Sequence, residues 1–376
     1  MKGIYIHIPF CRKICNYCDF YKMVVSDKFK SEYVDYLIKD LELTFEKNNI
    51  EKIDTIYIGG GTPSSLPLNL LEKLFQTLLR KVELSKLEEF TIEANPEDLT
   101  NEFIILLKKY FVSRVSIGVQ TFDNRNYPIL GRYTDFETLK EKIQLLKEIG
   151  INNYNLDLIY AIPNTSLANL ESDLDLMLSL KPNHISTYSL ILEEKTILHH
   201  RFLKEEVKMI DDELDAKMYE LIQNKLLANG YCQYEISNFA LPGYESKHNL
   251  IYWNYDEYYG IGASGSSFVG KKRYTKVANI KEYYRLLNLG KEPFDEVEII
   301  DDDRLIEDYI MLGLRKTNGI NLDDFEKRFN CSLFALFPNF KQMIEDQLLI
   351  FENNFIYINQ KYLYISNFII SKILFN

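Results

Sequence analysis

The feature that most constrains the fold of this chain is a regular alternation of short β-rich runs with longer amphipathic stretches. Six runs have strand character, at residues 4–8, 55–58, 89–93, 114–119, 154–159 and 184–190. Between them, apolar residues recur at the helical period in five stretches, at residues 31–47, 68–80, 101–110, 136–149 and 167–178. This order predicts parallel strands joined by helical crossovers. We therefore expect an α/β fold, either an open doubly wound sheet or a (βα) barrel, complete or partial.

Polar and glycine residues gather where these predicted strands end. Three consecutive glycines occupy positions 59–61, Asn95 and Gln120 follow the third and fourth runs, and Asp157 lies just inside the fifth. The carboxyl ends of parallel strands meet at one edge of the sheet, and ligands bind at that edge in such folds. The sequence thus predicts a ligand site there.

The second half of the chain lacks this alternation. A strong helical pattern covers residues 212–228, and a stretch rich in Tyr, Asn and Gly follows from Gly230 to Tyr274, which we expect to be mostly loop. An acidic run from Asp295 to Asp303 is typical of a boundary between domains. We therefore expect three parts: a barrel at residues 1–200, an extension at 201–294, and a small domain at 295–376.

The last part has the pattern of a small helical domain with a hairpin. Helices are expected near residues 305–314, 323–329 and 333–345. Two β-rich runs at 348–351 and 355–358 are separated by Asn353 and Asn354, which favour a tight hairpin turn. Helices followed by a hairpin indicate a winged-helix-like module, for which we expect a packing or lid role.

Charge and hydropathy exclude several classes of function. The 376 residues contain 44 Lys and Arg against 55 Asp and Glu, a net charge of −11, so no general attraction to nucleic acid is expected. No apolar run approaches the roughly 18 residues that a membrane-spanning helix needs. The N-terminus has too short an apolar stretch for a signal peptide. We therefore expect a cytoplasmic protein.

Three of the five cysteines form one cluster. Cys11, Cys15 and Cys18 are spaced C-x3-C-x2-C, whereas Cys232 and Cys331 stand alone. An odd count without a signal peptide argues against a disulfide framework. Three thiolates on one loop suit a cubane iron–sulfur cluster with one iron left open for a cofactor. A zinc site with His7 or a distant residue as fourth ligand, and a thioredoxin-like C-x-x-C pair, remain as alternatives.

The segments around these cysteines resemble a known family. Residues 6–10 lead into the cysteine motif, and Thr62 and Pro63 follow the three glycines, as in the radical S-adenosylmethionine (SAM) superfamily. Residues 93–96, 116–120, 130–132 and 155–160 are similar to segments of its oxygen-independent coproporphyrinogen III oxidase-like group. The resemblance spans residues 4 to about 268. It implies a partial (βα)6 barrel with a [4Fe-4S] cluster on Cys11, Cys15 and Cys18.

The resemblance also implies a SAM site on the strand edge. Its residues would be Tyr5, Tyr17, Gly60, Gly61, Thr62, Glu93, Gln120, Arg132 and Asp157. Glycines let backbone N–H groups approach a ligand closely, and Glu93 can pair with a cationic amino group. Each polar residue could instead be a hydrogen-bonded residue at a strand end. In the family, an electron from the reduced cluster cleaves SAM and the resulting 5′-deoxyadenosyl radical abstracts hydrogen; the sequence assigns no catalytic residue.

Two features resemble the HemW-type haem chaperone branch of this group. Asp19 and Phe20 follow Cys18, so the fourth cysteine of the oxidases is absent, and the motif H-N-x-x-Y-W begins at His248. The branch implies haem as cargo, His248 as a haem contact, and haem-accepting proteins as partners, which could be membrane-bound. The alternative is an enzyme that oxidatively decarboxylates coproporphyrinogen III, and a lone histidine could also be purely structural. Whether SAM is cleaved and whether the chain forms a homodimer are left open.

The chain departs from the family pattern at several positions. Ala161 and Asn164 stand where the family usually has glycines, and Thr134 stands where a histidine is usual. Ser266 lies in a segment that lacks a histidine common in chaperones. These departures leave the cysteines untouched, but they concern residues near the predicted rim.

Overall fold

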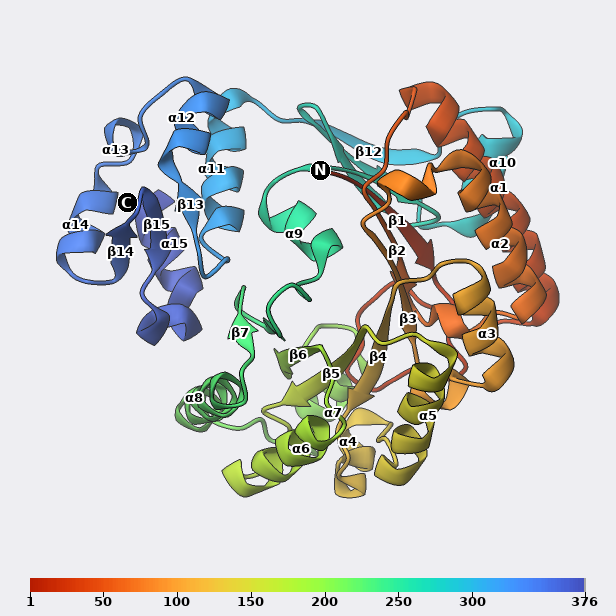
Figure 1. Ribbon diagram of the computed structural model, residues 1–376, viewed down its shortest axis with the longest axis horizontal. Coiled ribbons are helices and arrows are strands. Elements are labelled where there is room, and N and C mark those ends of the chain that lie inside the picture. Colours follow the sequence, from red (N-terminus) through yellow and green to blue (C-terminus); the bar gives the residue numbers. More distant parts are fainter. Residues whose placement is uncertain (375–376) are drawn as a thin grey trace.

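The computed structural model describes residues 1–374 (Figure 1). Its centre is a layer of six parallel strands: β1 (Lys2–Ile8), β2 (Thr55–Gly60), β3 (Glu89–Ala94), β4 (Arg114–Gln120), β5 (Tyr154–Tyr160) and β6 (His184–Ser189). The helices that connect them are α1 (Asp27–Asn48), α2 (Leu68–Lys81), α3 (Asn101–Lys109), α4 (Tyr127–Leu130), α5 (Phe136–Ile149) and α6 (Leu167–Ser179). All five amphipathic stretches expected from the sequence are helices of this set.

Strand order distinguishes between the two folds that the alternation allowed. Strands β1 to β6 are hydrogen-bonded in chain order, whereas the strand order of a doubly wound sheet reverses at a switch point. The longer connecting helices, α1, α2, α3, α5 and α6, lie along one side of the curved sheet (Figure 1). The partial (βα)6 barrel is therefore confirmed.

Side chains alternate between the two faces of this sheet. Ile56 and Ile58 on β2, like Ile92 on β3, belong to the hydrophobic core against the outer helices. The intervening residues, Tyr57 and Glu93 among them, point to the concave face. This inner face is polar, which is unusual for a packed barrel and prepares it to hold a ligand.

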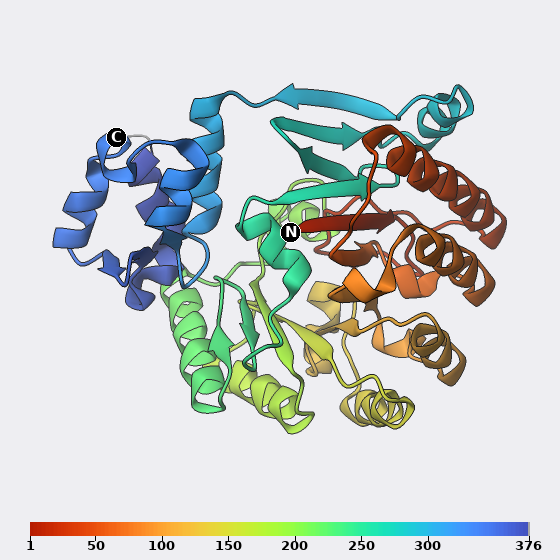
Figure 2. The ribbon, with the colours of Figure 1, turned by 45° about the horizontal axis from the view of Figure 1, so that its top comes forward.

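The prediction that residues 230–274 are mostly loop is wrong. This segment contains β7 (Cys232–Gln233), β8 (Asn238–Ala240), α9 (Lys247–Trp253), β9 (Glu257–Ile261), β10 (Ser266–Val269) and β11 (Lys272–Lys276). Strand β9 pairs in parallel with β1, β10 and β11 follow it antiparallel, and β8 pairs antiparallel with β6, which extends the sheet to 12 strands within the described range. Helix α9 lies on the concave side, between the sheet and the C-terminal domain (Figures 1 and 2).

The acidic run begins within the sheet and ends in the first helix of the C-terminal domain. Strand β12 (Phe294–Ile299) pairs antiparallel with β11 and is the edge strand, with most of its side chains exposed. Charged residues on an exposed edge discourage pairing with another chain, which explains the composition of this strand. The helices that precede β7 and β12 are α7 (Ile197–Leu203), α8 (Asp212–Ala228) and α10 (Ile280–Asn288).

The C-terminal domain has the winged-helix order of elements. It contains α11 (Asp302–Gly313), β13 (Ile320–Asn321), α12 (Leu322–Phe329), α13 (Leu333–Leu336), α14 (Asn339–Glu345), β14 (Leu349–Glu352), β15 (Phe355–Ile358) and α15 (Ser366–Leu374). The hairpin turns at Asn353 and Asn354, with φ of 49° and 67°, as expected for a tight turn. The helix expected at 333–345 is interrupted near Pro338, and strand β13, which pairs with β15, was not expected. No helix in residues 1–374 is long and apolar enough to cross a membrane.

Candidate functional site

The three clustered cysteines lie on one loop between β1 and α1. The ends of this loop are tied together, since Met23 N donates to Pro9 O at 2.7 Å and Cys11 N donates to Met23 O at 3.0 Å. All three cysteines are free thiols; Cys11 is buried and the other two are half-buried. The hydroxyl of Thr62, at the end of the glycine segment, donates to Cys11 Sγ at 3.6 Å.

The chemistry of the donor set suits an iron–sulfur cluster, because a cubane binds its cysteines through different irons and leaves one iron open. His7, the candidate fourth zinc ligand, uses both ring nitrogens: Nε2 donates to Tyr21 O at 3.0 Å, and Nδ1 accepts from the Tyr5 hydroxyl at 3.0 Å.

The glycine segment is required by close contacts at the end of β2. Gly60 has φ of +116°, and a Cβ added there would lie 2.7 Å from the ring of His7. A Cβ on Gly61 would lie 2.9 Å from the backbone of Phe10. The segment therefore packs directly against the strand that leads into the cysteine loop.

Glu93 on β3 lies directly beside the glycine segment. Its carboxylate accepts from the Tyr57 hydroxyl at 2.8 Å and from Gly60 N at 3.1 Å. Burial raises the pKa of Glu93 to about 7, although both hydrogen bonds oppose the shift. A carboxylate in this state is suited to meet a cationic group of a ligand, because that group would stabilise its charge.

A cavity of 380 Å³ opens beside this carboxylate. It is lined by Tyr5, His7, Phe20, Tyr21, Gly60, Glu93, Tyr252, Tyr258, Ser264 and Ser266. Tyr5, Gly60 and Glu93 of the predicted SAM set thus meet in one cavity. Tyr252 and Tyr258 form its aromatic wall, with ring centroids 4.7 Å apart in an edge-to-face arrangement. The cavity fits a small ligand with polar and aromatic parts.

The other predicted SAM residues lie along the neighbouring strand ends. Arg132 donates to Asn95 Oδ1 at 3.0 Å and to Gly118 O at 2.6 Å, and Gly118 is the register partner of Asp157 on β5. Gln120 ends β4 with φ of +70°, next to a break in register. Burial raises the pKa of Asp157. These residues share one rim, but they do not line the cavity beside Glu93.

Tyr17 lies apart from that cavity as well. It packs against a small hydrophobic cluster, separate from the main core, that contains Ile129 and Leu198. Nearby, Asn16 N donates to Leu130 O at 3.0 Å, and Leu198 N donates to Asn16 O at 2.8 Å. The cysteine loop is therefore anchored to α4 and α7.

His248 is fully buried at the first turn of α9. Its Nδ1 lies 2.7 Å from the Thr55 hydroxyl, and its Nε2 lies 2.9 Å from the Tyr252 hydroxyl. Its ring stacks on Tyr57 with centroids 5.2 Å apart. Burial lowers the pKa of His248 to about 3, so the ring is neutral. This geometry leaves neither ring nitrogen free and does not favour the expected haem contact.

Several residues of the inner face were not identified from the sequence. Tyr57 lies two positions before Gly59 on β2, so the strand period of two was a usable signal for it. Arg114 at the start of β4 is 2% exposed, and its Nε has no hydrogen-bond partner in the described chain. Tyr258 follows the H-N-x-x-Y-W motif, and nothing in its local pattern marked it.

The departures from the family pattern have local explanations. Ala161 and Asn164 adopt φ of 59° and 66°, the left-handed conformation that favours glycine. Both positions thus adopt a backbone conformation typical of glycine, with some strain at Ala161. The hydroxyl of Thr134 donates to Val119 O at 2.9 Å and is buried.

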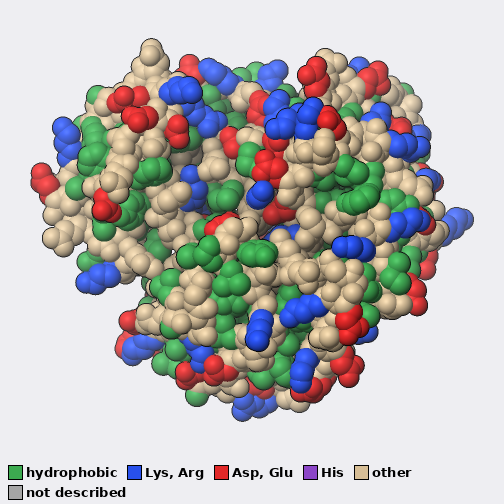
Figure 3. Space-filling view, in the orientation of Figure 1, with side chains coloured by type: hydrophobic (Ala, Val, Ile, Leu, Met, Phe, Trp, Pro, Cys, Tyr) green, Lys and Arg blue, Asp and Glu red, His purple; other side chains and the backbone are tan. Residues whose placement is uncertain are grey.

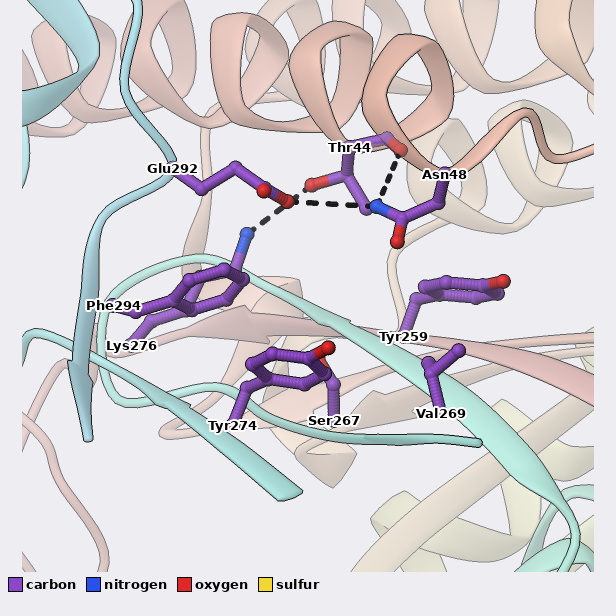
Figure 4. Close-up of a pocket in the computed structure, with 9 residues that line it drawn as sticks. All are labelled: Thr44, Asn48, Tyr259, Ser267, Val269, Tyr274, Lys276, Glu292 and Phe294. Atoms are coloured by element: carbon purple, nitrogen blue, oxygen red, sulfur yellow. Dashed lines mark hydrogen bonds between the residues drawn. The ribbon is translucent and has the colours of Figure 1, made fainter. Parts of the chain in front are cut away.

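Two other surfaces offer no comparable site. A cavity of 10 Å³ between α1 and the edge strands has room for about one water molecule (Figure 4). On the face shown in Figure 3, Lys and Arg side chains are interspersed with Asp and Glu and form no continuous basic surface.

Known proteins resemble the chain over nearly its full length. Residues 5–177 match the family model described as the radical SAM superfamily, and residues 300–361 match the HemN C-terminal domain. The chain is 39% identical over 371 residues to a protein of Lactococcus lactis named heme chaperone HemW, covering 98% of this chain and 96% of that protein. It is 38% identical over 351 residues to the Bacillus subtilis protein of the same name, covering 93% of each.

A solved structure shares the fold. Coproporphyrinogen III oxidase (HemN) from Escherichia coli superposes with a TM-score of 0.84, covering 100% of this chain and 90% of that one, at 19% identity. Since the sequences are so different, this match concerns the fold alone. The resemblance noted in the sequence is confirmed, and the chain belongs to the radical SAM superfamily and, within it, to the HemW family.

Proposed function

We propose that this protein is a haem chaperone, which binds haem and delivers it to haem-accepting proteins. The observation that carries the proposal is the similarity to proteins named heme chaperone HemW, at 38% to 39% identity over at least 93% of the chain. The absence of a fourth cysteine after Cys18 supports it. Phe20 stands in that place, is 64% exposed and lines the cavity beside Glu93.

The proposed cofactors are a [4Fe-4S] cluster and SAM. Cys11, Cys15 and Cys18 would hold the cluster, which supplies electron-transfer chemistry when bound. Tyr5, Gly60 and Glu93 would bind one part of SAM in the 380 Å³ cavity, with Glu93 facing its cationic amino group.

The remaining rim residues would complete the SAM site. The full set is Tyr5, Tyr17, Gly60, Gly61, Thr62, Glu93, Gln120, Arg132 and Asp157. Arg132 is held by Asn95 and Gly118 and keeps a fixed orientation on the rim. Gln120 is aimed by its left-handed backbone, and a Cβ on Gly118 would lie 3.0 Å from its amide nitrogen.

Haem titration of the cluster-loaded protein under anaerobic conditions tests the proposal. We expect saturable binding in the difference spectrum and no change in the mass of coproporphyrinogen III in the presence of SAM and reductant. A parallel reaction with a known oxidase shows that the assay works. Loss of two carboxyl groups from the substrate would instead make the protein a coproporphyrinogen oxidase, the alternative that the sequence left open.

The cluster assignment has a matched pair of variants. Cys15→Ala should lower the bound iron and sulfide, whereas Cys232→Ala, at an exposed cysteine on β7, should leave them unchanged. Equal iron content in both variants would contradict the assignment of Cys15.

A further inference from the structure

His248 lies in a slot that leaves no approach for a large planar ligand. A Cβ added at Gly3 of β1 would lie 3.0 Å from its Cε1, so the strand passes directly against the ring. Tyr57 stacks on the ring, with an interplanar angle of 29°. An imidazole binds iron through the lone pair of a free nitrogen, and both nitrogens here are engaged by Thr55 and Tyr252.

The backbone around His248 is anchored as well. The carboxylate of Glu89 accepts from Lys247 N at 2.9 Å and from His248 N at 3.2 Å. Ser246 caps the same helix by accepting from Asn249 N at 3.4 Å. Bonds to a carboxylate are stronger than those between neutral groups, so the start of α9 is fixed on the sheet. Turning the His248 side chain toward the cavity would break both hydrogen bonds of its ring and its stacking on Tyr57.

The contacts of His248 lead instead to the cavity wall. Its ring supports Tyr57, whose hydroxyl donates to Glu93 Oε1 at 2.8 Å. Its Nε2 fixes the hydroxyl of Tyr252, whose ring forms the wall with Tyr258. One buried imidazole thus contacts Tyr252, which lines the cavity, and Tyr57, which holds the carboxylate of the cavity residue Glu93.

We propose that His248 is a positioning residue of the SAM cavity, acting through Tyr57 and Tyr252, and that it does not ligate the haem iron. This inference rests on the proposed haem function for its haem half and on the proposed SAM site for its cavity half. The cavity half concerns the protein without haem and stands on the contacts of these three side chains.

Two substitutions separate positioning from iron ligation. His248→Gln keeps a donor and an acceptor that can reach Thr55 and Tyr252, whereas His248→Phe keeps the ring and loses both nitrogens. We expect His248→Phe to weaken SAM binding to the cluster-loaded protein by about three- to tenfold, the effect of one lost neutral hydrogen bond. His248→Gln should restore most of that affinity. Tyr252→Phe, which keeps His248, should reproduce the loss if His248→Phe folds poorly.

Haem spectra complete the test. We expect the Soret band and the electron paramagnetic resonance of bound haem to be the same in the wild type and both variants. Loss of the same signals in both variants, with recovery on adding imidazole, would make His248 the iron ligand and overturn the proposal. Unchanged SAM affinity in His248→Phe and Tyr252→Phe would overturn the positioning role. If the wild type bound no haem, the proposed function would fail, while the SAM comparison would still test His248.

Discussion

Lys276 provides the sharpest test of how the sheet extension is held on the barrel. Its side chain is 1% exposed, and its ammonium forms an ion pair with Asp40 of α1, which is fully buried. Figure 4 shows the side chain rising from β11 toward Thr44, to which it donates at 3.2 Å. Asp40 also accepts from the Tyr283 hydroxyl and from Gly262 N, both at 2.8 Å. Helix α1, helix α10 and the loop after β9 therefore meet at one carboxylate.

Removing the lysine leaves this carboxylate buried without its counter-charge. Breaking a buried ion pair in this way costs about 3–5 kcal/mol. Three hydrogen bonds to Asp40 remain, from the Thr44 hydroxyl, the Tyr283 hydroxyl and Gly262 N, and still stabilise the charge. We therefore expect Lys276→Met to lie near the lower end, about 3 kcal/mol. The additional change Asp40→Asn removes the unpaired charge and should recover part of the loss.

Urea unfolding of the cluster-loaded protein, followed by circular dichroism, measures the effect. Lys217→Met is the matched control, since Lys217 pairs with Glu213 on the exposed surface of α8 and should change stability little. A loss below about 1 kcal/mol for Lys276→Met would refute the reasoning, because an unpaired buried charge costs more than that. Equal stability of Lys276→Met with and without Asp40→Asn would refute it too.

Four further predictions concern the site and the C-terminal hairpin. Gly60→Ala should weaken SAM binding and lower the melting temperature, because the added Cβ would meet the ring of His7. The control Gly230→Ala has φ of +85° and nothing within 4 Å, so it should cause backbone strain alone. Equal SAM affinities of the two variants would contradict this prediction. The pKa of Glu93, about 7 when folded against 4.5 normally, means that its charge appears as pH rises through 7, so SAM affinity should increase over that range in calorimetric titrations and stay flat in Glu93→Gln. Since the folded state keeps a proton on Glu93 between pH 4.5 and 7, stability should fall as pH rises through that window, and Glu93→Gln should remove this slope from urea unfolding data. Asn354→Ala should destabilise the C-terminal domain by about 1 kcal/mol in thermal unfolding, because alanine is strained at its φ of +67°; no change would show that the turn has relaxed.

The first half of the fold could be predicted because its signals are local. A helix such as α5 is marked by apolar spacing within its own 14 residues, and it begins and ends at the expected positions. The strands β7 to β11 have two to five residues each, too few for a period to emerge. Their place depends on partners far along the chain; for example, Gly260 of β9 pairs with Tyr5 of β1. No local pattern could reveal that pairing.

Site residues could be predicted where the residue type itself is chemically unusual. They could not be predicted where the role of a residue depends on its neighbours in space. The cysteine spacing and the glycine segment identified a real loop and a real strand end. His248 has the same local sequence whether its ring is buried or open, and only the packing of Tyr57 and Gly3 decides between the two. Tyr252 was part of the motif, yet its role depends on Tyr258 of the following strand.

The pairing of β1 between β2 and β9 has a consequence for how the chain is made. During synthesis, β1 can join β2 early, but its other edge stays unpaired until β9 emerges from the ribosome. That open edge carries buried isoleucines at positions 4, 6 and 8 and continues directly into the cysteine loop. Nascent chains that stall before β9 would therefore expose an unpaired apolar edge strand next to reactive thiols. Such chains would be prone to aggregation. For the same reason, we expect a chain shortened to strands β1 to β6 to aggregate or be degraded instead of folding into a stable smaller protein.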